Sequence, residues 1–104
     1  MFCVIYSFNV KRGEEEKFKK AWRDYTILIY EHEGSFGSRL HKESDLNYIA
    51  YAQWPDEQTW QNAGNKMPAS SKLIGNNMRN SCAKIEVIHK LDVIDDILKN
   101  KTYG

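Results

Sequence analysis

Residues 2–29 read FCVIYSFNVKRGEEEKFKKAWRDYTILI, and within them the spacing of the apolar residues changes. Over residues 2–10, aromatic and β-branched side chains alternate along the chain, which predicts a β-strand with apolar residues on both faces. Gly13 interrupts the alternation and is typical of a turn. Over residues 14–29, apolar side chains recur about every 3.6 positions, and this spacing predicts an amphipathic helix that ends before Gly34.

The rest of the chain continues this alternation of strands and helices. The periodicities predict strands at residues 35–42 and 47–54, helices at 56–63 and 69–80, a strand at 82–91 and a short terminal helix at 92–99. The element order predicts an α+β, ferredoxin-like βαββαβ fold, in which the helices cover one face of a four-stranded antiparallel sheet. A chain of 104 residues has room for one such domain, which we take to span residues 1–104.

The uncovered face of this sheet predicts a partner subunit. The first and third strands carry apolar or aromatic residues on both faces, although helices cover only one face of the sheet. No other predicted element can cover that face, and a large exposed apolar patch favours association. A symmetric homodimer is the simplest closure.

The composition excludes several classes of protein. Hydrophobic residues make up 41% of the chain, which is too many for a disordered protein. The 15 Lys and Arg nearly balance the 14 Asp and Glu, so we expect no nucleic-acid partner. No apolar run approaches the roughly 20 residues of a membrane helix, so we expect no membrane partner. Because Asn9 and Lys11 follow the first apolar run too soon for a signal peptide, we expect a cytoplasmic protein.

Metal and nucleotide motifs are absent from the sequence. Cys3 and Cys82 are isolated from each other, which predicts two buried thiols. The histidines, His32, His41 and His89, share no i, i+4 spacing, so we expect no zinc site. The chain has no P-loop and no dinucleotide-binding motif, and we expect no bound cofactor.

Four motifs give the chain a family resemblance. They are Lys11-Arg12-Gly13 after the first strand, Phe18 with Trp22 in the first helix, Glu33-Gly34-Ser35-Phe36-Gly37 at the second strand, and Tyr51-Ala52-Gln53-Trp54-Pro55-Asp56-Glu57 at the entry to the second helix. On these motifs the chain resembles the dimeric α+β barrel superfamily and, within it, the antibiotic biosynthesis monooxygenase family. The resemblance implies a homodimer and, among the family's activities, oxygenation of aromatic compounds without a cofactor. The haem-degrading branch uses Asn, Trp and His where this chain has Tyr6, Ala63 and Leu73, so we do not expect haem oxygenation.

The resemblance also implies a ligand cavity between the helices and the sheet of one subunit. We expect two residues to carry chemistry there. The Trp54 indole N–H would donate to a carbonyl or an oxygen-derived anion, and the His41 imidazole would deprotonate a phenol or hydroquinone. The candidates for substrate binding are aromatic or polar residues: Tyr6, Trp22, Arg39, Asn47, Tyr51 and Trp60. Each role has a structural alternative, since Trp54 and Trp60 are also typical of core packing and His41 of a solvated sheet edge.

These residues favour a monooxygenase that acts on a small aromatic or quinol substrate without a cofactor. Two alternatives stay open, a non-enzymatic ligand-binding or interaction dimer and a small-molecule isomerase, because one fold hosts all three. Oxygen uptake would identify the oxygenase, turnover without oxygen the isomerase, and binding without turnover the ligand-binding protein.

Overall fold

The computed structural model describes residues 1–99, so the last five residues of the predicted domain lie outside the described part. The elements are β1 (Phe2–Val10), α1 (Glu15–His32), β2 (Gly37–Lys42), β3 (Asn47–Trp54), α2 (Glu57–Gln61), α3 (Ser71–Asn80) and β4 (Cys82–Asp92). This order confirms the predicted ferredoxin-like α+β fold. The second strand begins at Gly37, two residues later than predicted. The φ of Gly37 is +102°, which belongs to the region that favours glycine.

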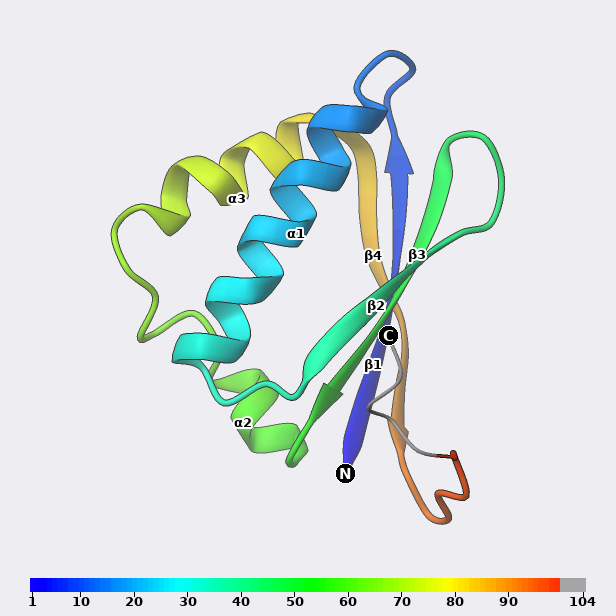
Figure 1. Cartoon of the computed structure of the whole chain (residues 1–104), viewed down its shortest axis with the longest axis vertical. Coiled ribbons are helices and arrows are strands. Elements are labelled where there is room, and N and C mark those ends of the chain that lie inside the picture. Colours follow the sequence, from blue (N-terminus) through cyan, green and yellow to red (C-terminus); the bar gives the residue numbers. More distant parts are fainter. Residues whose placement is uncertain (100–104) are drawn as a thin grey trace.

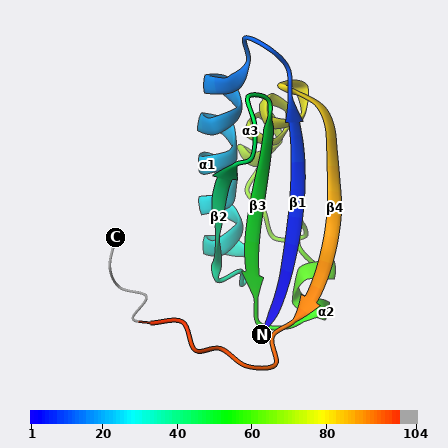
Figure 2. The ribbon, with the colours of Figure 1, turned by 90° about the vertical axis from the view of Figure 1, so that its right-hand side faces the viewer.

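The four strands form one antiparallel sheet in the order β2-β3-β1-β4. The helices all lie on one side of it (Figure 1), and the strands are seen in front of the helices when the sheet is turned toward the viewer (Figure 2). We call the helix-covered face the inner face. The other, the outer face, carries Ile5, Ile49 and Tyr51, which strand register places on the same side.

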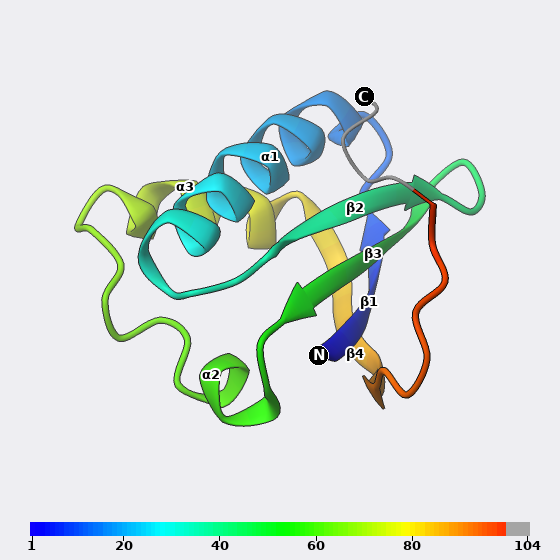
Figure 3. The same ribbon diagram turned by 60° about the horizontal axis from the view of Figure 1, so that its bottom comes forward.

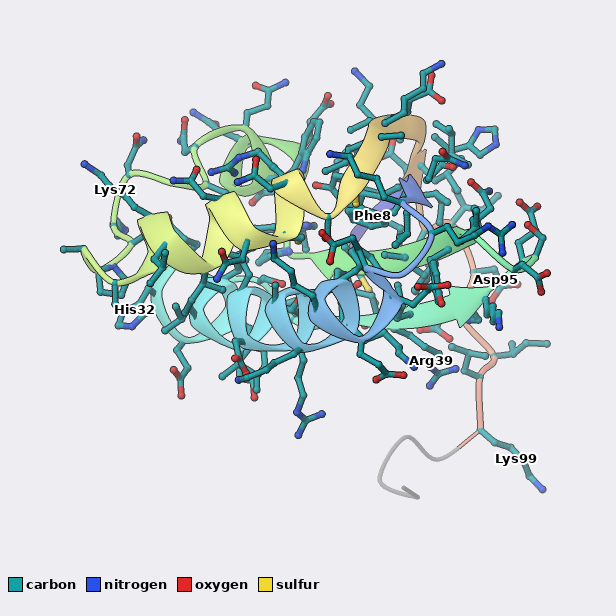
Figure 4. All side chains as sticks on the ribbon, turned by 90° about the horizontal axis from the view of Figure 1, so that it is seen from above. Phe8, His32, Arg39, Lys72, Asp95 and Lys99 are labelled. Atoms are coloured by element: carbon teal, nitrogen blue, oxygen red, sulfur yellow. The ribbon has the colours of Figure 1, made fainter. Side chains whose placement is uncertain are left out.

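The core forms where the inner face meets α1. Phe18 on α1 is completely buried, and its ring centroid lies 5.0 Å from that of Phe8 and 5.3 Å from that of Tyr48. Phe8 lies in the interior in Figure 4. Trp54 and Val4 belong to a second buried cluster on the same face. The alternation of apolar residues along β1 and β3 therefore fixes which side of each strand joins the core.

Local caps and turns position the shorter helices. The Asp56 carboxylate accepts hydrogen bonds from the backbone N–H of Thr59 and from its hydroxyl, both at 2.8 Å, as the predicted N-cap requires. These bonds lower the pKa of Asp56. Figure 3 shows α2 beyond the end of β3, apart from α1 and α3, which lie together over the sheet.

Two bulges in β4 change which of its residues share a face. The register opposite β1 shifts between Ile5 and Tyr6, so Ile5 pairs with His89 whereas Tyr6 pairs with Val87. Each bulge inserts an extra residue and so reverses the alternation. Regular alternation along the strand predicted at residues 82–91 would place Val87 and His89 on one side. The bulges make this wrong, because Val87 belongs to the inner face and His89 to the outer face.

The predicted terminal helix at residues 92–99 does not form. The chain stays paired with β1 through Asp92, and the Val93 N–H donates to the Met1 carbonyl at 2.9 Å. The apolar residues of this segment find no core, since Ile94 is 96% and Ile97 is 90% exposed. A short helix without a packed face is not stable in water. The segment instead crosses the end of the outer face, from β4 toward β2 (Figures 2 and 3).

Within residues 1–99, no helix is both long enough and apolar enough to span a membrane.

Candidate functional site

A cavity of about 140 Å³ lies between α1 and the inner face of the sheet. Strands, helices and the β2 entry all contribute to its wall, and aromatic rings dominate it. The lining residues are Tyr6, Phe8, Trp22, Tyr25, Thr26, Ile29, Ser35, Ser38, Ala50, Ala52, Trp54, Met78 and Ile85. The small side chains of β3, Ala50 and Ala52, leave the space that the neighbouring rings surround.

Trp54 belongs to the lining of this cavity, and its indole carries a hydrogen-bond donor that has no partner among residues 1–99. The side chain is 3% exposed, and its Nε1 is buried without a hydrogen-bond partner among residues 1–99. A buried donor without an acceptor costs about 1–3 kcal/mol, and most buried polar atoms in native proteins are paired. An acceptor brought by a ligand would remove that cost.

Tyr6 supplies a second polar group, and a neighbouring indole holds it. The Trp60 Nε1–H donates to the Tyr6 hydroxyl oxygen at 2.8 Å, which leaves the phenolic proton of Tyr6 available to another acceptor. Burial raises the pKa of Tyr6 above its ordinary value, and the hydrogen bond from Trp60 opposes this only in part. Tyr6 therefore remains a neutral donor at neutral pH.

Two serine hydroxyls of the wall are engaged with the backbone. The Ser38 hydroxyl donates to the Tyr51 carbonyl at 2.9 Å, and the Ser35 hydroxyl donates to the Gln53 carbonyl at 3.3 Å. Among the described residues, no Asp, Glu, His, Lys or Arg lines the cavity. The site therefore combines aromatic walls with uncharged donors, and it lacks a side chain that would act as a general base near neutral pH.

The structure separates the eight predicted site residues into two groups. Tyr6, Trp22 and Trp54 line the cavity, and Trp60 stands behind Tyr6 without lining it. The expectation that the remaining four line the same cavity is wrong, because register places them on the outer face: Arg39, His41, Asn47 and Tyr51. A strand sends alternate side chains to opposite faces, so these residues cannot join the inner-face set.

His41 and Arg39 are both exposed on β2, an edge strand, and Arg39 lies at the periphery in Figure 4. His41 Nδ1 lies 3.2 Å from the Ile49 carbonyl oxygen. The Asn47 amide donates to the Glu43 carboxylate at 2.6 Å, so Asn47 belongs to the β2–β3 turn. The predicted base thus lies across the sheet from the predicted donor, Trp54.

Sequence reasoning missed several lining residues. Tyr25, Thr26 and Ile29 lie three, four and seven residues after Trp22, so they share its face of α1. Helical spacing could therefore have predicted them as lining residues. Met78 and Ile85 carry no such signal. They reach the cavity only because α3 and β4 pack beside α1 and β1.

A second, larger hollow of about 490 Å³ lies on the outer face, between the C-terminal segment 91–98 and the Cys3–Tyr51 pair. The Cys3 thiol donates to the Tyr51 hydroxyl at 3.0 Å, and this hydrogen bond, followed by burial, raises the pKa of Tyr51. Within residues 1–99 no three His, Cys, Asp or Glu side chains form a group that could hold a metal ion. The inner cavity, with its unpaired donor, is the candidate site.

Comparison with known proteins agrees with this architecture. A family model described as antibiotic biosynthesis monooxygenase matches residues 1–66. SnoaB, a cofactor-independent oxygenase from Streptomyces nogalater, superposes with a TM-score of 0.74 at 14% identity, over 92% of this chain and 95% of SnoaB. A conserved protein from Methanosarcina mazei Go1 gives 0.70 at 15% identity, over 86% and 89% of the two chains. Rv0793 from Mycobacterium tuberculosis gives 0.71 at 9% identity, over 93% and 98%. No protein with a curated description matches the sequence.

Proposed function

The chain belongs to the antibiotic biosynthesis monooxygenase family, and we propose that it oxygenates a small aromatic or quinol substrate in the inner cavity without a bound cofactor. The observation that carries this proposal is the aromatic cavity, one of whose lining residues, Trp54, has a buried Nε1 without a hydrogen-bond partner among residues 1–99. The name of the structural neighbour SnoaB, a cofactor-independent oxygenase, supports the absence of a cofactor.

A phenolic substrate would enter the cavity in its neutral form, and hydrogen-bond donors would stabilise the anion that develops during the reaction. A phenolate or enolate oxygen is a strong acceptor, and a hydrogen bond between an indole N–H and an anion is stronger than one to a neutral group. In a water-poor aromatic pocket, a fixed donor of this kind lowers the free energy of the developing anion. In this proposal Trp54 and the neutral hydroxyl of Tyr6 are the donors. The substrate proton leaves to solvent because no lining side chain within residues 1–99 is a base near neutral pH.

The substrate anion then supplies the electrons for oxygen. Its carbon transfers an electron to O₂, and recombination of the two radicals gives a carbon-bound peroxide. Loss of water from this peroxide, with the hydrogen taken from the same carbon, leaves a carbonyl. A CH₂ group and O₂ thus become a C=O group and water, so one oxygen atom enters the product and the other leaves as water.

Oxygen consumption measured in parallel with single-ring hydroquinones and with an anthrone tests the proposal. Trp54→Phe should reduce the rate about 100- to 1,000-fold, the effect of removing one donor to a developing anion. Tyr30→Phe, on the exposed side of α1, should leave the rate unchanged. No oxygen uptake above the uncatalysed rate would refute the proposal. Loss of turnover in His41→Ala with full activity in Trp54→Phe would place the chemistry on the outer face instead.

A ligand-binding protein without turnover is the second candidate. The observation that favours it is the lack of a titratable acid or base among the described lining residues, other than the tyrosines. Such a protein would bind aromatic ligands saturably and consume no oxygen. The same lack weakens the isomerase alternative, because moving a proton between carbon atoms needs a positioned base.

Members of this family are generally dimers, and we propose that this chain forms a homodimer through the outer face. Leu91 on β4 is 46% exposed, and strand register places it on the outer face together with the half-buried Ile5 and Ile49. Such a surface favours association with a like surface. Native mass spectrometry should show twice the chain mass, whereas a monomer at micromolar concentration would contradict this proposal.

A further inference from the structure

We infer that the inner cavity selects uncharged aromatic ligands of a single ring and excludes fused-ring and carboxylated aromatic compounds. The inference rests on the proposed function only in placing the ligand in the same cavity. It concerns which molecules bind, and so it applies to an oxygenase and to a binding protein alike.

The volume of the cavity sets the first limit. At about 140 Å³ it is close to the roughly 150 Å³ at which an engineered apolar protein cavity binds benzene. Pockets for drug-sized ligands are larger, about 300–1,000 Å³. A second fused ring would therefore have to displace wall atoms, and the adjoining core side chains, such as Phe8 at 4% exposed, have little space to move.

The chemistry of the wall sets the second limit. Among the described residues the lining carries no cation, so a carboxylate inside the cavity would be buried without a partner. The hydroxyls of Ser35 and Ser38 already donate to the backbone, whereas Tyr6, Tyr25 and Thr26 are further lining residues that carry a hydroxyl group. A neutral oxygen on the ring matches such groups, because each hydroxyl can donate.

Met78 on α3 and Ile85 on β4 control the size limit. Ile85 is 37% exposed and is the lining residue most open to solvent, whereas the others are half-buried or buried. Met78 is half-buried and lines the cavity from the neighbouring helix. Shortening either side chain would extend the cavity toward solvent without touching Trp54 or Tyr6.

Titration under nitrogen, followed by NMR of the indole N–H groups, tests the inference. The full chain has three tryptophans, and the Trp54 signal is identified by its loss in Trp54→Phe. Phenol should shift this signal, 1-naphthol should bind at least about tenfold more weakly, and 4-hydroxybenzoate at pH 7 about a hundredfold more weakly. Met78→Ala and Ile85→Ala should each improve naphthol binding about tenfold relative to phenol, and Leu73→Ala, an exposed change on α3 outside the cavity, should not.

The outcomes separate this inference from the proposed function. Equal binding of the three ligands, or a Trp54 signal that none of them shifts, would overturn the inference. The predicted selectivity without oxygen uptake from any single-ring hydroquinone would support the inference and refute the oxygenase. Oxygen uptake confined to fused-ring substrates would support the oxygenase and overturn the inference.

Discussion

Replacing Trp54 with phenylalanine should change the stability of the free protein far less than the burial of this residue suggests. Phenylalanine buries on the order of 50 Å² less apolar surface than tryptophan, which costs about 1 kcal/mol at about 25 cal/mol per Å². The space left by the smaller ring adds up to about 1 kcal/mol. The change also removes the unpaired Nε1 donor, whose burial costs about 1–3 kcal/mol. The net change in the free energy of unfolding should therefore lie within about 1 kcal/mol of zero.

Trp60→Phe is the matched control, because the chemical change is the same and the indole N–H is paired. It removes the 2.8 Å hydrogen bond to Tyr6 and leaves the Tyr6 oxygen without its donor. The Trp60 ring lies 5.8 Å from the Phe2 ring between centroids, and phenylalanine at position 60 still places an aromatic ring there. We expect Trp60→Phe to lower the free energy of unfolding by about 2 kcal/mol.

Urea denaturation followed by circular dichroism measures both variants, since tryptophan fluorescence itself changes with the substitution. Protein concentration is held constant because dimer formation contributes to the measured stability. A loss of 2 kcal/mol or more in Trp54→Phe, equal to or larger than that in Trp60→Phe, would refute the argument. It would mean that the Trp54 N–H is satisfied in the free protein, and the cavity would then lack the free donor on which the proposed function depends.

Three further predictions follow from the core, a turn and a buried phenol. Phe18→Ala should cost about 3–5 kcal/mol of stability in the same assay, because the side chain is completely buried between two rings; a loss under about 1 kcal/mol would contradict this packing. Gly34→Ala should lower the free energy of unfolding by about 1–3 kcal/mol, because φ is +81° and the added Cβ would lie 3.3 Å from the Thr59 methyl group. An unchanged midpoint in thermal or urea unfolding would exclude this strain. Burial raises the pKa of Tyr6, so the unfolded chain releases this proton first and stability should fall as pH rises above about 10. Urea unfolding midpoints measured across the alkaline range should fall less steeply with pH in Tyr6→Phe than in the unmodified protein. An unaltered pH profile would show that the phenol is not buried as described.

Element order and strand faces could be predicted because both follow from local backbone geometry. The alternation from Phe2 to Val10 and the helical spacing that brings Phe18 and Trp22 together hold in the folded chain. Asp56 caps its helix because an N-cap needs contact over only three residues. The predicted terminal helix does not form because no surface packs against its apolar residues. The spacing of residues in the sequence does not reveal whether such a surface is present.

The candidate site was only partly predictable. Alternation already places Arg39 and His41 on one face of their strand and Leu40 on the other, but only the packed sheet shows that Leu40 joins the core. The prediction of a joint site with Trp54 therefore combined residues from both faces. The β4 bulges then moved His89 to the outer face, because an inserted residue reverses every later side chain and leaves no mark in composition.

Sequence by itself determined the fold class, the order of the elements and the apolar faces, because φ/ψ preferences and side-chain alternation act over a few neighbouring residues. Tertiary structure alone decided that Trp54 keeps an unpaired N–H, that Trp60 donates to Tyr6 across 54 positions of the chain, and that Met78 and Ile85 bound the cavity. These properties depend on which distant atoms come within hydrogen-bond or van der Waals distance. That outcome is set by the packing of α1, α3 and β4 against the sheet, and not by any local pattern.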